Sequence, residues 1–104
     1  MGLNDHRTFG TRVREARLAK SITLRELARR LGISAAFQTL IEQDRNIPTS
    51  ELIERTSKEL ELDANELCGL VGKLTPDVER TLSKVARTDP KFFRTLVERI
   101  GGAR

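Results

Sequence analysis

The sequence has few of the residues from which metal sites and disulfide frameworks are built. Its 104 residues include one cysteine, Cys68, and one histidine, His6, and there is no tryptophan or tyrosine. A single cysteine excludes an internal disulfide and a cysteine-based zinc site, and a single histidine excludes a pair of histidine ligands. The sequence also lacks a nucleophile–base pair and a phosphate-binding loop. We therefore expect a protein that is not an enzyme and that uses no metal or cofactor.

Long apolar runs are also missing, although 38% of the residues are hydrophobic and 33% are charged. This composition is too apolar for a disordered chain, and the longest apolar stretches are too short to span a bilayer. Residues 1–10 contain no apolar segment of the kind found in a signal peptide. We expect a cytoplasmic protein with no membrane partner, made of one domain or of one domain and a short extension.

The net charge of +4 is distributed unevenly along the chain. Residues 1–30 contain eight basic and three acidic residues, residues 31–72 contain three and eight, and residues 73–104 contain eight and four. The basic first third indicates a polyanionic partner, although an ordinary solvated helix surface has the same composition.

Helix signals recur along the whole chain, and no segment alternates apolar and polar residues over the length of a strand. We predict an all-α fold with helices over about 9–20, 24–31, 34–43, 49–60, 64–70, 76–87 and 90–100. Thr23 and Glu26 have the spacing of a capping box, in which the threonine hydroxyl accepts from the Glu26 N–H and the carboxylate reaches back to Thr23.

The segment 23–42 has the pattern of a helix-turn-helix. A capped helix of two turns ends at Gly32, and Ser34 caps the helix that follows. Such a motif places its second helix in the major groove of DNA while the first helix lies across the backbone. A corner between two helices of a bundle has the same pattern, so the spacing alone leaves both interpretations open.

The segments around this motif resemble the Cro/CI-type helix-turn-helix regulators, also called the XRE family. The resemblance covers about residues 8–72 and rests on FGTRVREARLAKSITLRELARRLGIS at 9–34, LIE at 40–42, IPTSEL at 47–52 and LELDANEL at 60–67. It implies a lambda-repressor-like domain of five helices over residues 1–72, followed by a two-helix extension over 73–104. It also implies a bacterial or phage-encoded transcriptional regulator, most often a dimeric repressor that binds a palindromic operator.

The resemblance also implies the roles of individual residues. It places Ala35, Ala36, Gln38, Thr39 and Leu40 at or beside the base-facing positions, phosphate contacts at Thr23, Arg25, Ser34, Arg45 and Asn46, and an internal ion pair between Arg17 and Glu42. Alanine and leucine can contact a thymine methyl group, and Thr39 can do so or donate a hydrogen bond. Gln38 stands where relatives usually have an apolar core residue, so it either turns outward to read a base or is buried and bonded to the backbone.

Three departures from the family pattern weaken the prediction of strong base reading. Relatives often carry long polar side chains at base-facing positions, a tyrosine in place of Phe37, and a glycine in place of Asp44, whose negative charge is expected near the DNA. An apolar recognition helix with Phe37 or Leu40 exposed is also suited to binding a protein. We therefore expect double-stranded DNA as the partner, and we keep another regulatory protein as the alternative, as for an antiactivator or an antitoxin-like protein.

The two helices expected in the C-terminal third each carry an apolar stripe. The stripes consist of Val78, Leu82 and Val85 in the first helix and of Phe92, Phe93, Leu96, Val97 and Ile100 in the second. Two short helices cannot bury both stripes alone, so the extension either packs back on the helices at 49–60 and 64–70 or forms a dimer interface. We favour a homodimer, because two-fold symmetry places two recognition helices about one DNA turn apart.

Overall fold

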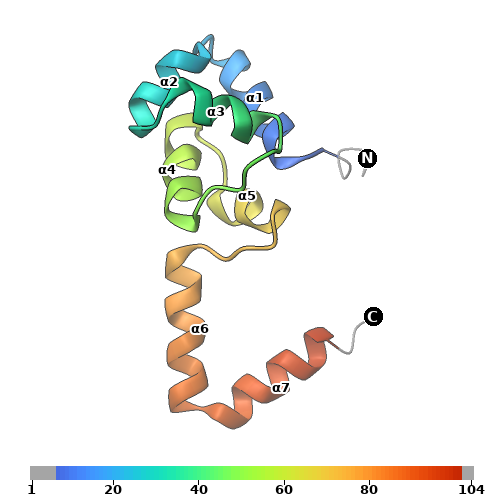
Figure 1. Ribbon diagram of the computed structural model, residues 1–104. Coiled ribbons are helices and arrows are strands. Elements are labelled where there is room, and N and C mark those ends of the chain that lie inside the picture. Colours follow the sequence, from blue (N-terminus) through green and yellow to red (C-terminus); the bar gives the residue numbers. More distant parts are fainter. Residues whose placement is uncertain (1–6, 102–104) are drawn as a thin grey trace.

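The computed structural model describes residues 7–101 and consists, over that range, of helices joined by short loops (Figure 1). The helices are α1 (Phe9–Ala19), α2 (Leu24–Leu31), α3 (Ala35–Glu42), α4 (Ser50–Leu60), α5 (Ala64–Leu70), α6 (Pro76–Thr88) and α7 (Pro90–Gly101). The predicted all-α class is confirmed, and each boundary agrees with the sequence-based one to within one residue. The side chain of Ile100, one of the expected interface residues, lies outside the described part of the chain.

Side chains cap the first six helices, and the predicted caps Thr23 and Ser34 are confirmed. The cap residues Thr8, Thr23, Ser34, Thr49, Asp63 and Thr75 each accept a hydrogen bond from a backbone N–H of the first turn. Gly32 ends α2 in the left-handed conformation, with a φ of 73°. These local signals explain why the boundaries could be predicted so closely.

The capping box at the start of α2 is only half formed. The Glu26 N–H donates to Thr23 Oγ1 over 3.0 Å, as predicted. The Glu26 carboxylate, however, accepts hydrogen bonds from Arg29 and Arg30 instead of reaching back to Thr23. The prediction for this carboxylate is wrong because charge-assisted bonds to two guanidinium groups are stronger than one bond to a neutral amide.

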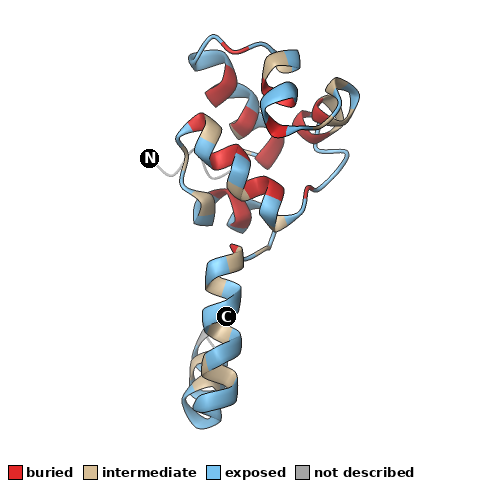
Figure 2. Ribbon diagram, turned by 90° about the vertical axis from the view of Figure 1, so that its left-hand side faces the viewer, coloured by how far each residue is buried: buried red, intermediate tan, exposed pale blue. Residues whose placement is uncertain are grey.

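The helices α1 to α5 pack into one unit with a shared core. Its buried apolar residues include Phe9, Val13, Leu27, Leu31, Ile41, Ile53, Leu60 and Leu67, so every one of the five helices contributes. In this unit α3 packs against both α1 and α2, while α4 packs against α1, α2 and α5. Buried residues are concentrated in this part of the molecule (Figure 2). The second helix of the motif is therefore held from two sides.

The helices α6 and α7 extend away from this unit and pack on each other (Figures 1 and 2). Every residue of α6 is described, and none of them is buried. In α7 the side chains of Phe92 and Val97 are 55% and 50% exposed. The alternative in which the extension packs back on α4 and α5 is therefore wrong. In a single copy, the described residues of the two apolar stripes are half-buried except for Phe92 and Val97, which are exposed.

The start of α1 and the end of α3 approach each other closely at Gly10. A Cβ atom at this position would lie 2.4 Å from the carbonyl oxygen of Glu42. Just beyond α3, Asp44 has a φ of 60°, and its carboxylate accepts hydrogen bonds from the Gly10 N–H over 2.7 Å and the Thr8 hydroxyl over 2.6 Å. The positive end of α1 thus offsets the negative charge of Asp44.

We expect Gly10→Ala to lower the free energy of unfolding by about 1–3 kcal/mol, because the added methyl group requires the backbone of α3 to move. Urea denaturation followed by circular dichroism measures this change. The matched control is Gly69→Ala in α5, where no atom lies within 4 Å of the added Cβ. There alanine should raise the stability by about 0.5–1 kcal/mol through its helix propensity. Equal effects at the two positions would contradict a close contact at Gly10.

Candidate nucleic-acid interface

The helices α2 and α3 form a helix-turn-helix in which each helix has one buried face. The turn is closed by a hydrogen bond from the Ile33 N–H to the Ala28 carbonyl oxygen over 3.0 Å. The buried residues of α2 are Leu27, Ala28 and Leu31, and those of α3 are Gln38, Ile41 and Glu42. The helical period therefore places positions 35, 36, 39 and 40 toward the outside of α3.

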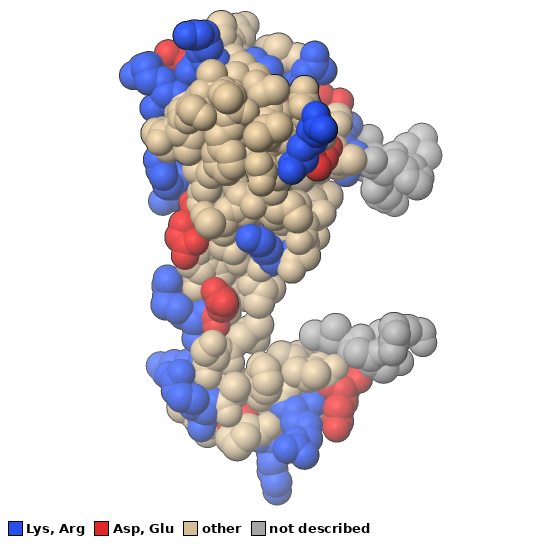
Figure 3. All heavy atoms as spheres, viewed as in Figure 1, with Lys and Arg blue, Asp and Glu red and all other residues tan. Residues whose placement is uncertain are grey.

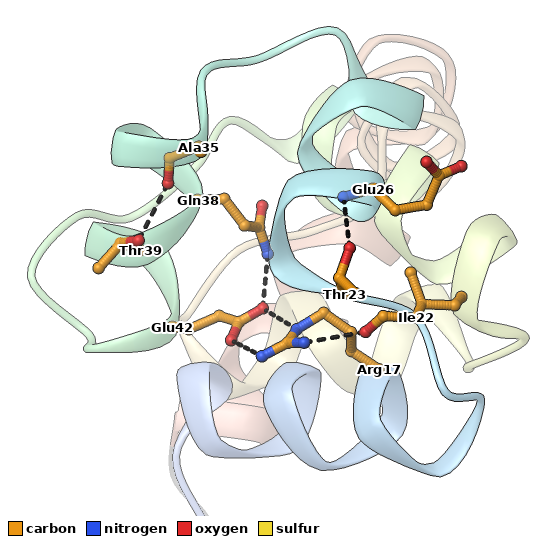
Figure 4. A network of polar contacts seen from close by, with 8 residues as sticks. All are labelled: Arg17, Ile22, Thr23, Glu26, Ala35, Gln38, Thr39 and Glu42. Carbon is orange, nitrogen blue, oxygen red and sulfur yellow. Dashed lines mark hydrogen bonds and ion pairs between the residues drawn. The ribbon is translucent and has the colours of Figure 1, made fainter.

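A buried ion pair connects α1 to the end of α3 (Figure 4). The Arg17 guanidinium binds Glu42 through two parallel bonds, from Nε to Oε2 over 2.9 Å and from Nη2 to Oε1 over 3.0 Å. Its Nη1 donates to the Ile22 carbonyl oxygen over 2.9 Å. The side chains of Arg17 and Glu42 are only 8% and 4% exposed. The ion pair that the family resemblance implies is therefore present, and it fixes the position of α3.

The structure contradicts the assignment of Gln38 as a base-facing residue. Gln38 is 1% exposed, and its Nε2 donates to Glu42 Oε2 over 2.9 Å. It lies one helical turn before Glu42 and therefore on the inner side of α3, from which no side chain reaches a groove. For a buried Gln38 the sequence predicts a bond to the backbone, but its hydrogen bond goes to the Glu42 carboxylate.

The other four base-facing candidates lie on the outer side of α3, where Ala36 is exposed and Ala35, Thr39 and Leu40 are half-buried. The Thr39 hydroxyl donates to the Ala35 carbonyl oxygen over 3.0 Å, so it offers DNA a methyl group and acceptor lone pairs instead of the predicted donor. The surface over α3 is mostly neutral, with Lys and Arg and a few Asp and Glu residues around it (Figure 3).

Phe37, which the sequence suggested as an exposed protein-binding residue, is half-buried and packs against the core. Its place in α3 turns the ring toward the other helices and away from the outer face. Leu40, the other apolar group named for a protein-binding recognition helix, is also half-buried, so neither of the two is fully exposed.

The five phosphate-contact candidates Thr23, Arg25, Ser34, Arg45 and Asn46 are all exposed. The hydroxyl oxygens of Thr23 and Ser34 accept the capping bonds of α2 and α3, each over 3.0 Å. Each hydroxyl hydrogen is left to donate to a phosphate oxygen, next to the free N–H groups of a helix N-terminus. Arg45 and Asn46 follow the other end of α3, so candidates flank both ends of this helix.

Part of the positive charge of α2 is neutralised within the protein. Hydrogen bonds from Arg29 and Arg30 lower the pKa of Glu26 to about 2, and the same interaction raises the pKa of Arg29. Arg30 also lies 3.6 Å from Glu59. Because carboxylates already bind these two arginines, we expect them to contribute less to phosphate contacts than Arg25.

Cys68 and the acidic side chains of residues 7–101 do not form a second site. Cys68 is fully buried, and burial raises the pKa of its thiol. Within residues 7–101 no group of three or more His, Cys, Asp or Glu residues is placed to hold a metal ion. Over the same range no helix combines the length and the apolar character needed to cross a membrane.

Comparison with known proteins shows the family of the chain. The family described as "helix-turn-helix domain" matches residues 8–70, which is more than half of the chain. The chain belongs to this family. No curated protein sequence matches it.

Two solved structures resemble this helix-turn-helix protein. The hypothetical transcription factor NHTF from Neisseria is 25% identical, with 72% of this chain and 79% of that chain covered and a TM-score of 0.54. A chain of the SinR protein/SinI protein complex is 24% identical, covers 90% and 95% of the two chains and has a TM-score of 0.55. The second likeness concerns the fold, and its coverage includes residues of α6 and α7. Together with the family, the transcription-factor neighbour supports a DNA-binding regulator.

We expect Arg17→Met to lower the free energy of unfolding by about 3–5 kcal/mol, because it leaves the Glu42 carboxylate buried without its cation. Methionine keeps much of the apolar packing, so the loss measures the charge. The control is Arg80→Met, since Arg80 faces Asp77 over 3.5 Å in an exposed pair that is worth less than about 1 kcal/mol. Urea denaturation of the two variants gives both values. Similar losses in the free energy of unfolding would mean that the buried pair contributes no more to stability than the exposed pair.

Proposed function

We propose that this helix-turn-helix regulator binds double-stranded DNA as a homodimer and represses transcription from a palindromic operator. The observation that carries the proposal is the way in which α3 is held and exposed. Its inner side is fixed by a buried ion pair, its outer side presents Ala35, Ala36, Thr39 and Leu40, and candidates for phosphate contacts flank both ends. This is the arrangement that a helix needs to enter the major groove in a defined register.

The character of the outer face suggests how bases are read. Alanine, threonine and leucine make apolar contacts with thymine methyl groups, and they lack the paired donors and acceptors that recognise guanine or adenine. Selectivity should therefore come from thymine positions and from the shape of the DNA. Most of the affinity should come from phosphate contacts, which depend strongly on salt.

Selection from a randomised duplex library, followed by gel-shift titration at two salt concentrations, tests the proposal directly. The full chain should enrich a two-fold symmetric sequence, and its affinity should fall as the salt concentration rises. Absence of binding at low salt would overturn the DNA-binding function. Binding of another regulatory protein, the alternative function, would then be the remaining interpretation of the helix-turn-helix surface.

The homodimer is proposed from the apolar residues of α6 and α7, none of which is fully buried in one copy over the described range. Phe93 and Leu96 are half-buried between exposed neighbours, and Phe92 and Val97 expose half of their surface. A second copy of the same pair of helices would cover these groups through an isologous contact. It would also leave both copies of α3 free for two half-sites of an operator.

We expect Arg45→Ala to weaken binding to all DNA sequences alike and to reduce the slope of log affinity against log salt by about 0.9, because one phosphate contact is lost. Leu40→Ala should instead alter the preference among thymine-containing sites and leave the slope unchanged. Gel-shift titrations over a salt series measure both quantities. A uniform loss for Leu40→Ala, or an unchanged slope for Arg45→Ala, would count against the assigned contacts.

We expect Phe93→Glu to yield a monomer in sedimentation velocity experiments, because a charge cannot be buried in an apolar interface without a partner. Thr95→Glu is the matched control, since Thr95 is exposed on the same helix and should leave the dimer intact. The monomeric variant should retain its helical circular dichroism spectrum and bind a single half-site weakly. A dimer that persists in Phe93→Glu would place the interface elsewhere.

A further inference from the structure

Glu42 is bound by more than its arginine partner. Its carboxylate accepts two hydrogen bonds from Arg17 and a third from Gln38 Nε2, over 2.9 Å. A buried ion pair requires additional hydrogen bonds to the lone pairs that its partner does not reach. Gln38 supplies such a bond from within α3 itself.

The position of the Gln38 amide is determined by this carboxylate. Rotating the amide by 180° would place its oxygen, an acceptor, against a carboxylate oxygen, which is also an acceptor. The amide nitrogen must therefore face Glu42, and the amide oxygen points away from it (Figure 4). Among the described residues this buried oxygen has no hydrogen-bond partner.

The Gln38 amide gains one bond to a buried carboxylate and leaves one buried acceptor unpaired. A hydrocarbon side chain of similar volume would remove both, so the two effects on stability oppose each other. A polar group inside a buried network can instead restrict the structure to one arrangement. Gln38 holds the Glu42 carboxylate, and Glu42 binds Arg17 of α1. Through this network Gln38 would restrict how α3 is oriented on α1.

This restriction matters because the outer side of α3 carries only short side chains. Contacts between methyl groups weaken steeply when the atoms separate by a fraction of an ångström beyond their optimal distance. A long arginine or glutamine could adjust its rotamer to compensate for such a displacement, whereas Ala35 and Ala36 cannot. Base reading by this face therefore depends on how firmly α3 is held.

We propose that Gln38 is a positioning residue for DNA specificity: it never touches DNA, and through Glu42 it fixes α3 so that the short outer side chains meet the bases. This inference rests on the proposed DNA-binding function. It assigns Gln38 a role that is the opposite of direct base reading, because it acts from the inner side of the helix.

The test uses the full chain and two duplexes, one that the wild-type chain selects from a randomised library and a shuffled duplex of equal length and composition. Gln38→Leu removes the amide and keeps the side-chain volume. The ratio of the affinities for the selected and the shuffled duplex should fall about tenfold, a coupling that is typical within one hydrogen-bond network. The affinity for the shuffled duplex and its salt dependence should not change.

The control is Ile41→Val, which alters a buried neighbour on α3 that makes no side-chain hydrogen bond. It lowers stability without changing the network, so its affinity ratio should equal that of the wild-type chain. Gln38→Met, which is unbranched and also lacks the amide, should behave like Gln38→Leu.

Each further outcome has a defined meaning. An unchanged affinity ratio in folded Gln38→Leu and Gln38→Met would overturn the inference, and so would an equal loss in Ile41→Val. If both Gln38 variants fail to fold by circular dichroism, Gln38 is required for folding and the specificity role is also rejected. Failure of the wild-type chain to select any duplex would refute the proposed function itself, which distinguishes the two failures.

Discussion

The position of the recognition helix depends on the buried ion pair between Arg17 and Glu42. Burying two charges is costly, and the cost is offset here by two parallel bonds, by a bond from Arg17 to the Ile22 carbonyl oxygen, and by the bond from Gln38. The close approach of α1 and α3 at Gly10 acts at the same helix end. Because α3 has only eight residues, restraints at its C-terminal end fix its whole length.

Those parts of the structure that depend on neighbours in the sequence could be predicted, and those that depend on competition between partners could not. Caps such as Thr23 and Ser34 act within one turn, so they located the helix boundaries. The Arg17–Glu42 pair spans 25 positions and came from the family resemblance alone. The sequence left two environments open for Gln38, and it gave the Glu26 carboxylate the wrong partner, because the choice depended on where the arginines lie in three dimensions.

The structure shows which basic residues of the first third of the chain are bound to carboxylates. Two of the arginines that make the first third basic are bound to Glu26, and the surface over α3 is mostly neutral (Figure 3). The positive groups that remain exposed, among them Arg25 and Arg45, lie on either side of this neutral surface along the chain. On the proposed function, affinity and selectivity would come from different residues: cations around this surface would attract phosphates, and the short side chains of α3 would contact bases.

The weak base discrimination expected of α3 suggests a role for the C-terminal helices α6 and α7. A good bidentate contact with a base is worth about 1–3 kcal/mol of discrimination, and alanine, threonine and leucine cannot make one. One copy of α3 therefore distinguishes sites poorly from the large excess of other DNA. A dimer joined through α6 and α7 would read two half-sites at once and add their discrimination energies. On the proposed function, the exposed apolar groups of α7 and the weak base reading of α3 are related features: the first would supply the dimer that the second would require.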